Sequence, residues 1–377
     1  MTPKIADFLR IQRPPTPCLV VDLDVIAENY RSLHHALPLV AIYYAVKANP
    51  ARPVLERLVG LGCSFDAASA WEVDECLAVG ADPAVISYGN TVKKRRDIAH
   101  AFDRGVRMFA FDSREELEKL AQEAPGSKVY CRILTISEDA QWPLSRKFGC
   151  SLAMARDLML RAADAGLQPH GLSFHVGSQQ TNPKWWDVAI GRSAMVFSDL
   201  REAGLDLAML NLGGGFPARY RGDSLPPIER FASEIMQSVQ RHFGNRIPEL
   251  IIEPGRSIAA EAGVIRTEVV VVARKGYDDP DRWVYFDVGK FGGLAETMDE
   301  AIQYPIVTPH DGGAVGPVKI AGPTCDGADI LYENCGYTMP LALRSGDQVE
   351  LLSAGAYTSV YASQRFNGFA PMAEYYI

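Results

Sequence analysis

One lysine of this chain stands where its amine can do chemistry. Lys47 follows a run of β-branched and aromatic residues, 40–46, and precedes the turn-forming pair Asn49-Pro50. Because such a run predicts a buried strand, the lysine at its end is expected at the mouth of a site and out of bulk water. Desolvation disfavours the ammonium form, so the amine can lose its proton and form an imine with an aldehyde. For this segment alone a surface lysine is the better interpretation, and the rest of the chain reverses it.

Two further motifs each follow a predicted strand. The triplet Gly213, Gly214 and Gly215 allows a close backbone approach and aims N–H groups at an anion, although a lone triplet favours a tight turn. Glu253 and Arg256 stand three residues apart. The guanidinium can pair with a phosphate and the carboxylate with a protonated ring nitrogen, or the two can form a surface salt bridge with each other.

His175 lies in a third motif, residues 173–178. A histidine in an apolar strand is more often a satisfied core residue than a catalyst, but at the mouth of a barrel an imidazole can stack on a flat ring. A lysine, a glycine loop, an arginine, a carboxylate and a stacking histidine together suit pyridoxal 5′-phosphate. That cofactor needs an aldehyde partner, a phosphate cradle, a charge near its ring nitrogen and a wall against its face.

Composition sets limits on the class of protein. The chain has 377 residues, of which 47% are hydrophobic and 22% charged, enough for two domains with substantial cores. A net charge of −8 argues against nucleic-acid and acidic-membrane partners. Seven irregularly spaced cysteines indicate neither a disulfide framework nor a metal site. No stretch has the length and apolar character of a signal peptide or a membrane span, so a cytoplasmic protein is expected.

The elements that must position these side chains repeat along the chain. Eight short apolar runs alternate with segments of helical spacing, which predicts a parallel sheet closed into a (β/α)8 TIM barrel over residues 25–262. Residues 1–24 and 263–377 contain further strands without long helices and predict a second, β-sandwich or barrel domain. Chemically capable residues follow the barrel runs, on the face where such barrels place active sites. The runs are 40–46, 63–67, 85–88, 108–111, 129–133, 171–176, 207–212 and 250–252.

Six motifs in order along nearly the whole chain resemble one family, the fold-type III pyridoxal-phosphate-dependent decarboxylases. This family shares the architecture of alanine racemase and acts on basic amino acids, and its ornithine decarboxylase branch resembles the chain most. The motifs are Tyr44-Ala45-Val46-Lys47-Ala48-Asn49, His175-Val176-Gly177-Ser178, Gly213-Gly214-Gly215-Phe216-Pro217, Glu253-Pro254-Gly255-Arg256, Gly322-Pro323-Thr324-Cys325-Asp326-Gly327 and Gly355-Ala356-Tyr357.

The resemblance implies a role for each matched residue. Lys47 holds the cofactor through an imine, Glu253 keeps its ring nitrogen protonated, and His175 stacks on the ring. Asp66 and Arg132 match positions close to the cofactor. The phosphate is bound by Gly213, Gly214, Gly215, Ser178, Arg256 and Tyr357.

In this family the active site is completed across a homodimer. The resemblance therefore implies that Cys325 and Asp326 enter the site of the neighbouring subunit. Cys325 delivers a proton to the substrate after carbon dioxide departs, and Asp326 binds the far ammonium of the substrate.

The implied reaction is decarboxylation of L-ornithine to putrescine in polyamine biosynthesis, with L-lysine to cadaverine as a further activity. A second acidic residue is expected near the far ammonium, and the ungapped register favours Glu300 while the local pattern allows Glu296. Arginine and diaminopimelate decarboxylases remain alternatives, although Asp326-Gly327 after Cys325 argues against diaminopimelate. A non-catalytic regulator of this fold is less expected, because it would have lost cofactor residues that this chain retains.

Overall fold

The computed structural model describes residues 1–135, 140–142 and 147–377. The chain forms two compact units. The barrel unit comprises Ala27–Pro217 and Leu225–Gly255, and the β unit comprises Met1–Ile26, Ala218–Ser224 and Arg256–Ile377. Residues 25–26, 218–224 and 256–262, which the sequence predicts in the barrel, are therefore grouped with the β unit.

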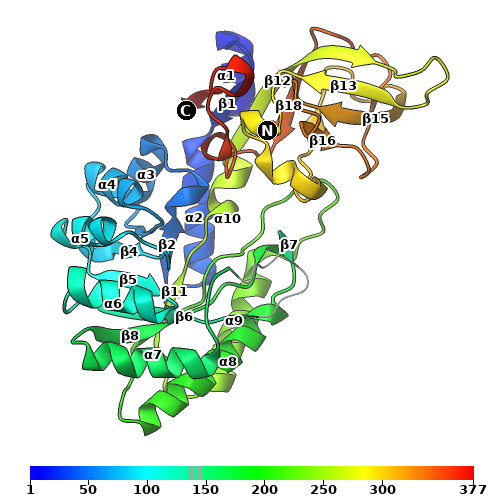
Figure 1. Ribbon diagram of the computed structural model, residues 1–377. Helices are drawn as coiled ribbons and strands as arrows, with labels where there is room; N and C mark the ends of the chain where they lie inside the picture. Colours follow the sequence, from blue (N-terminus) through cyan, green and yellow to red (C-terminus); the bar gives the residue numbers. More distant parts are fainter. Residues whose placement is uncertain (136–139, 143–146) are drawn as a thin grey trace. The chain divides into compact units, whose positions relative to one another are not determined.

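Eight parallel strands close the barrel, as the sequence predicts (Figure 1). The barrel closes where the last strand, β11, pairs with the first, β2, with Leu250 opposite Val40. Their interior is packed with large side chains such as Tyr43, Met108 and Tyr130, so the barrel is filled and its chemistry belongs at the strand ends. The strands are β2 (Val40–Ala45), β3 (Ser64–Ala67), β4 (Ile86–Tyr88), β5 (Met108–Phe111), β6 (Lys128–Arg132), β8 (Gln168–Ser173), β10 (Met209–Asn211) and β11 (Glu249–Ile252).

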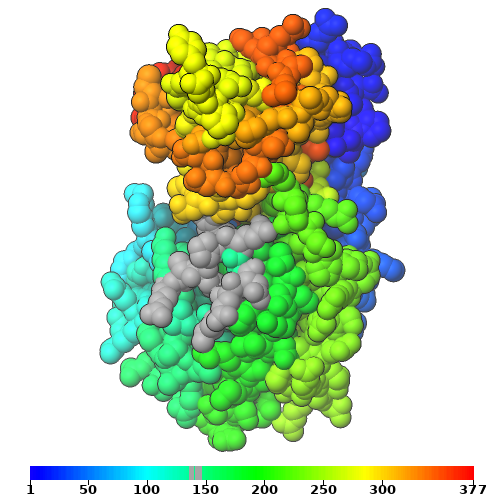
Figure 2. Space-filling model, turned by 90° about the vertical axis from the view of Figure 1, so that its right-hand side faces the viewer, coloured from blue at the N-terminus to red at the C-terminus, as the bar shows by residue number. Residues whose placement is uncertain are grey.

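Amphipathic helices lie outside these strands, and Figure 2 shows the green surface that α8 and α9 contribute. Several begin at a serine whose hydroxyl accepts a hydrogen bond from a backbone N–H of the first turn. Ser69, Ser113 and Ser151 do so for α4, α6 and α7. The helices are α2 (Leu23–Ala36), α3 (Arg52–Val59), α4 (Ala70–Ala78), α5 (Arg95–Asp103), α6 (Arg114–Glu123), α7 (Leu152–Asp164), α8 (Lys184–Glu202) and α9 (Ile228–Phe243). A small ribbon of β7 (Ala140–Trp142) and β9 (Ser178–Gln180) accompanies the barrel.

A buried ion pair joins α6 to the barrel wall. The Lys93 side chain is 0% exposed, and its Nζ lies 2.9 Å from Oε1 of Glu116, whose side chain is 3% exposed. The same amine donates to the carbonyls of Asn90 and Ala110. Burial lowers the pKa of Lys93 to about 8, although Glu116 opposes the shift. The unfolded chain therefore binds more protons between about pH 8 and 10.5, and this group makes stability rise with pH across that window.

Glu116→Gln is expected to lower the free energy of unfolding at pH 7 by about 1–1.5 kcal/mol, because it leaves a buried ammonium without its counter-ion. With a pKa of about 8, neutralising Lys93 in the folded protein at pH 7 costs about 1.4 kcal/mol, which limits the loss. The loss is expected to shrink at pH 9.5, where Lys93 is mostly neutral in both proteins. Urea unfolding at the two pH values measures this. Glu118→Gln, which breaks an exposed pair with Arg114, is the control and should change stability by about 0.5 kcal/mol or less. An equal loss for both variants would contradict the prediction.

The β unit is built on a nine-stranded sheet. The N-terminal strand β1 lies between β12, which is antiparallel to it, and β19, which is parallel, so the two ends of the chain share one sheet as expected. Helix α1 (Pro3–Gln12) packs Ile5 and Leu9 onto this sheet. The strands are β1 (Cys18–Val21), β12 (Gly263–Ala273), β13 (Arg282–Phe286), β14 (Ile306–Val307), β15 (Val315–Ala321), β16 (Ile330–Tyr332), β17 (Thr338–Pro340), β18 (Gln348–Leu352) and β19 (Ala373–Tyr376).

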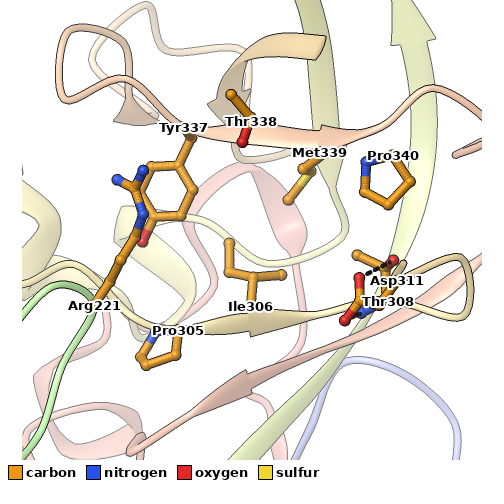
Figure 3. Close-up of a pocket in the computed structure, with 9 residues that line it drawn as sticks. All are labelled: Arg221, Pro305, Ile306, Thr308, Asp311, Tyr337, Thr338, Met339 and Pro340. Atoms are coloured by element: carbon orange, nitrogen blue, oxygen red, sulfur yellow. Dashed lines mark hydrogen bonds between the residues drawn. The ribbon is translucent and has the colours of Figure 1, made fainter. Parts of the chain in front are cut away.

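A pocket of about 240 Å³ lies in the β unit, and none of its lining residues is a site residue predicted from the sequence (Figure 3). At one end the Arg221 guanidinium lies 3.9 Å from the ring centroid of Tyr337 and donates to the carbonyls of Cys335 and Gly336. At the other end Asp311 accepts a hydrogen bond of 2.6 Å from the Thr308 hydroxyl. These polar groups bind one another or the backbone, which indicates a structural role.

Across the part of the chain that the structure describes, no helix combines the length and the apolar character needed to span a membrane.

Candidate active site

Lys47 lies at the predicted end of the first barrel strand. The strand β2 ends at Ala45, and Lys47 sits in the short 3-10 helix η1 (Val46–Ala48) that follows. Its side chain is 50% exposed, and its Nζ lies 3.6 Å from Oδ2 of Asp66. The sequence predicts that desolvation of Lys47 favours the neutral amine. The observed neighbour is instead a carboxylate, which favours the ammonium.

Asp66, near the end of β3, is buried. Burial raises its pKa well above the usual range, the nearby Glu253 carboxylate adds to the effect, and Lys47 opposes it. Among the residues that the structure describes, Oδ1 of Asp66 has no hydrogen-bond partner. A side chain at Gly89 would collide with Asp66, so the glycine is required there. A buried carboxylate with an unsatisfied oxygen beside a lysine is a feature of functional sites more than of structural ones.

Glu253 directly follows β11 and is half-buried. Its Oε1 accepts a hydrogen bond from the side-chain amide of Asn211, and Oδ1 of Asn211 accepts one of 2.9 Å from the backbone N–H of Gly213. Asn211 thus connects the carboxylate to the glycine loop. Asn211 was not predicted as a site residue, because the sequence shows only an amide near the end of a predicted strand.

The glycine triplet is required by its backbone neighbours. Gly213 and Gly215 have φ of 68° and 102°, the left-handed region that favours glycine. A Cβ at Gly213, Gly214 or Gly215 would collide with the carbonyl of Phe174, Glu253 or Gly177, respectively. The structure therefore shows a tight turn against the neighbouring strand ends, and the phosphate-binding role remains a prediction.

His175 lies just beyond β8, which ends at Ser173, and not within the strand as expected. Burial, together with the cations of Arg132 and Lys47, lowers the pKa of His175 to about 3. The imidazole is therefore neutral at physiological pH. A neutral ring that is partly exposed suits stacking against a flat cation better than donation of a proton.

Arg132 ends β6, and its guanidinium lies 5.0 Å from the ring centroid of Phe148. Burial lowers the pKa of Arg132, with Glu253 the largest opposing influence. Ser178 is half-buried and begins β9. The barrel unit thus gathers a lysine, two carboxylates, an arginine and a histidine whose charges influence one another.

The other selected residues belong to the β unit. The Arg256 guanidinium lies 4.9 Å from the ring centroid of Tyr357. Glu296 forms a buried ion pair with Arg256. Oε1 of Glu300 accepts hydrogen bonds from the backbone N–H groups of Glu333 and Asn334, at 2.5 and 2.6 Å. Burial would raise the pKa of Glu300, but these N–H groups outweigh it and the net shift is downward.

Cys325 and Asp326 lie on an exposed turn of the β unit. Asp329, which the sequence analysis did not select, organises this turn. It is buried and accepts hydrogen bonds from the backbone and hydroxyl of Thr324 and from the backbone of Lys290. The turn is therefore held from within while its cysteine faces outward.

These residues fit pyridoxal 5′-phosphate. The barrel unit offers an amine for the aldehyde, the half-buried Glu253 for a ring nitrogen and the neutral His175 for a ring face. Oδ2 of Asp66 lies beside the amine, and Oδ1 of the same carboxyl group is the unsatisfied oxygen. No cluster of His, Cys, Asp or Glu side chains that would hold a metal ion occurs within residues 1–135, 140–142 and 147–377.

Comparison with known proteins supports this chemistry. Residues 23–260 match the family model described as pyridoxal-dependent decarboxylase, pyridoxal binding domain. Lysine/ornithine decarboxylase of Selenomonas ruminantium is 35% identical over 95% of this chain and 88% of its own length. Ornithine decarboxylase of Rattus norvegicus is 34% identical over 95% of this chain and 80% of its own length.

A solved structure extends the likeness to the whole fold. Lysine decarboxylase from Selenomonas ruminantium, in complex with PLP and cadaverine, superposes with a TM-score of 0.88 at 34% identity, covering 100% of this chain and 93% of that one. Similarity in sequence and similarity in fold therefore coincide.

Proposed function

The chain belongs to the fold-type III pyridoxal-phosphate-dependent decarboxylases of the ornithine/lysine decarboxylase group, and we propose that it converts L-ornithine to putrescine and carbon dioxide, with L-lysine to cadaverine as a second reaction. The observation that carries the proposal is the Lys47–Asp66 pair at the strand ends of a barrel whose neighbouring loops carry Glu253 and a neutral His175. The product putrescine would place the enzyme in polyamine synthesis.

When bound, the cofactor supplies an electron sink for the pair released as the carboxylate leaves. Lys47 binds its aldehyde, and Glu253, held by Asn211, keeps the ring nitrogen protonated. His175 covers one face of the ring without competing for that proton, because its own pKa is about 3. Asp66 orients the lysine, and Arg132 balances the charge of Glu253.

The phosphate contacts come from two sets of residues in this proposal. In the barrel unit they are Gly213, Gly214, Gly215 and Ser178. In the β unit they are Arg256 and Tyr357, which already lie against each other.

A homodimer with shared active sites is the second part of the proposal. Cys325 is exposed and its turn is held from within by Asp329, which suits a side chain that acts in a neighbouring subunit. Its thiol delivers a proton to Cα of the substrate after carbon dioxide leaves.

Asp326 is proposed to bind the far ammonium of the substrate. Both oxygens of Glu296 contact Arg256, and Oε1 of Glu300 holds two backbone N–H groups. Asp326 is exposed, and among the residues that the structure describes its Oδ1 accepts a hydrogen bond of 2.8 Å from the backbone N–H of Ala328, in its own turn. Of the three carboxylates that the sequence analysis proposed, Asp326 is therefore the best placed to receive an ammonium group.

Carbon dioxide release from the cofactor-loaded enzyme tests the substrate, with ornithine, lysine, arginine and meso-diaminopimelate in parallel. Ornithine is expected to give the highest kcat/KM and lysine the next. A single methylene is worth about 1–3 kcal/mol, so both are expected to react. Preference for arginine or diaminopimelate would overturn the assigned substrate and leave the family intact.

Asp326→Asn is expected to lower kcat/KM for ornithine by about 10–100-fold, mainly through KM, because a hydrogen bond to a charged group is lost. Steady-state kinetics of Asp326→Asn, Glu300→Gln and the exposed control Asp278→Asn measure this. Wild-type kcat/KM in Asp326→Asn, with the loss appearing in Glu300→Gln, would move the role to Glu300.

A further inference from the structure

Arg256 and Glu296 form a bidentate ion pair inside the β unit. Nη1 of Arg256 lies 2.7 Å from Oε2 of Glu296, and Nη2 lies 2.5 Å from Oε1. The two side chains are 3% and 6% exposed. Arg256 begins the short helix α10 (Arg256–Ala259), and Glu296 lies forty residues later in the 3-10 segment η5 (Ala295–Glu300). Parallel N–H···O contacts of this kind fix the plane of a guanidinium as well as its position.

Two tyrosines hold the same guanidinium. Nη1 of Arg256 donates a hydrogen bond of 2.8 Å to the hydroxyl of Tyr220, and Tyr357 places its ring centroid 4.9 Å from Cζ. Tyr304 packs edge-on against Tyr220 at 5.6 Å. Burial alone would lower the pKa of Arg256, but Tyr220 and Glu296 outweigh it and the net shift is upward. The arginine is therefore a permanent cation in a wall of aromatic side chains.

The charge of Glu296 affects the binding of a phosphate group by Arg256. A buried guanidinium that has no counter-ion is strongly unfavourable. Glu296 supplies that counter-ion from the chain itself. When a phosphate group also contacts Arg256, the carboxylate is a second anion on the same cation and repels the phosphate.

We infer that Glu296 is a positioning residue for Arg256: it orients the guanidinium and neutralises its charge in the cofactor-free chain, and it thereby weakens binding of the cofactor's phosphate group. The inference rests on the phosphate role proposed above for Arg256. It gives Glu296 a different task from the substrate contact that the sequence suggested. The two tasks separate experimentally, because loss of a substrate contact raises KM for ornithine, whereas loss of the counter-ion changes the affinity for the cofactor.

Glu296→Gln removes the charge and keeps the shape. The dissociation constants of pyridoxal 5′-phosphate and of pyridoxal, which lacks the phosphate, are measured by spectral titration of the full-length chain after removal of cofactor. The variant is expected to bind pyridoxal 5′-phosphate about tenfold more tightly, with the affinity for pyridoxal unchanged. In thermal unfolding the cofactor-free variant is expected to melt below wild type, and inorganic phosphate is expected to raise its melting temperature more than that of wild type.

Glu350→Gln is the matched control. It breaks another, partly buried arginine–glutamate pair of the same unit, in which Nη2 of Arg266 lies 2.6 Å from Oε1 of Glu350. This variant is expected to melt at a lower temperature as well, but its preference for pyridoxal 5′-phosphate over pyridoxal should equal that of wild type. Glu350→Gln thus shows the effect of a general loss of stability, which added phosphate should not restore. Glu296→Gln shows in addition the loss of the counter-ion of Arg256, which added phosphate should replace.

Weaker binding of pyridoxal 5′-phosphate by Glu296→Gln, or an equal change for both ligands, would overturn the inference. If Glu296→Gln does not fold, Glu296→Asp lengthens the pair and is expected to raise the preference for the phosphorylated ligand by a smaller factor. An unchanged or lower preference in that variant contradicts the inference.

Arg256→Ala separates a failure of the inference about Glu296 from a failure of the phosphate role proposed for Arg256. If Arg256→Ala leaves the preference unchanged, the phosphate role of Arg256 is wrong, whereas a lost preference in Arg256→Ala with no effect in Glu296→Gln removes only the role of Glu296.

Discussion

Replacement of Lys47 by alanine is expected to abolish the visible absorbance of bound cofactor at about 420 nm and to lower kcat by at least about 10³-fold. Lys47 is the lysine at the strand ends of the barrel that lies 3.6 Å from Asp66. Without its amine the cofactor has no covalent attachment to the protein and is lost more readily. An absorption spectrum of the purified variant and a carbon dioxide release assay together measure the effect.

Lys47→Arg is the matched variant, because it keeps a cation beside the buried Asp66 but cannot bind an aldehyde. Both variants are expected to be inactive, whereas Lys47→Arg should retain more of the wild-type thermal stability. The exposed Lys94→Ala, elsewhere on the barrel unit, should behave as wild type. Substantial decarboxylation by Lys47→Ala would show that the lysine assignment is wrong.

Replacement of Cys325 by alanine is expected to lower the rate of amine formation by about 10²–10⁴-fold, the usual contribution of a positioned proton donor. Without the thiol, the proton is expected to reach the cofactor in place of Cα. The products then include the amino aldehyde and pyridoxamine 5′-phosphate. Chromatography of the products, alongside the rate of carbon dioxide release, distinguishes the two fates of the proton. Full rate with clean putrescine would contradict the role of Cys325.

The same two variants test the shared active site. When Lys47→Ala and Cys325→Ala chains are mixed and allowed to exchange, half of the dimers are expected to contain one of each, with one intact site apiece. Activity should recover to about one quarter of the wild-type value, as follows from two-fold symmetry. Cys335→Ala, which removes a partly buried cysteine of the same unit, is the control for Cys325→Ala and should keep its activity. No recovery on mixing would show that each chain completes its own site.

The barrel could be predicted from the sequence because each of its strands can be recognised from its own local residue pattern. A parallel strand buried on both faces has an unbroken apolar sequence. Each of the eight predicted runs overlaps one observed strand: the match is complete for β5 at Met108–Phe111, whereas β8 begins three residues before its predicted run. The carboxyl ends of the strands in a closed barrel lie on one face. The sequence alone therefore predicts Lys47, Asp66 and Glu253 on the same face of the barrel. The cofactor class followed from their residue types.

Pairing across long separations in the chain was not predictable. The motif containing Glu253 and Arg256 left open a salt bridge between these two residues. The structure instead pairs Arg256 with Glu296, forty residues away, and joins Glu253 to Asn211, forty-two residues away. Sequence spacing carries no information about such partners, because hydrogen bonds and ion pairs depend on distance in space.

The amino-acid sequence by itself thus determined the barrel, the family and the residues that can do chemistry, since these depend on local patterns and residue types. Tertiary structure decided the electrostatic state of those residues. It makes His175 neutral, leaves Lys47 half-exposed beside a carboxylate and gives Glu296 a buried arginine as its partner. The physical reason is that burial and neighbouring charge set the protonation state of a side chain, and both arise only when distant parts of the chain pack together.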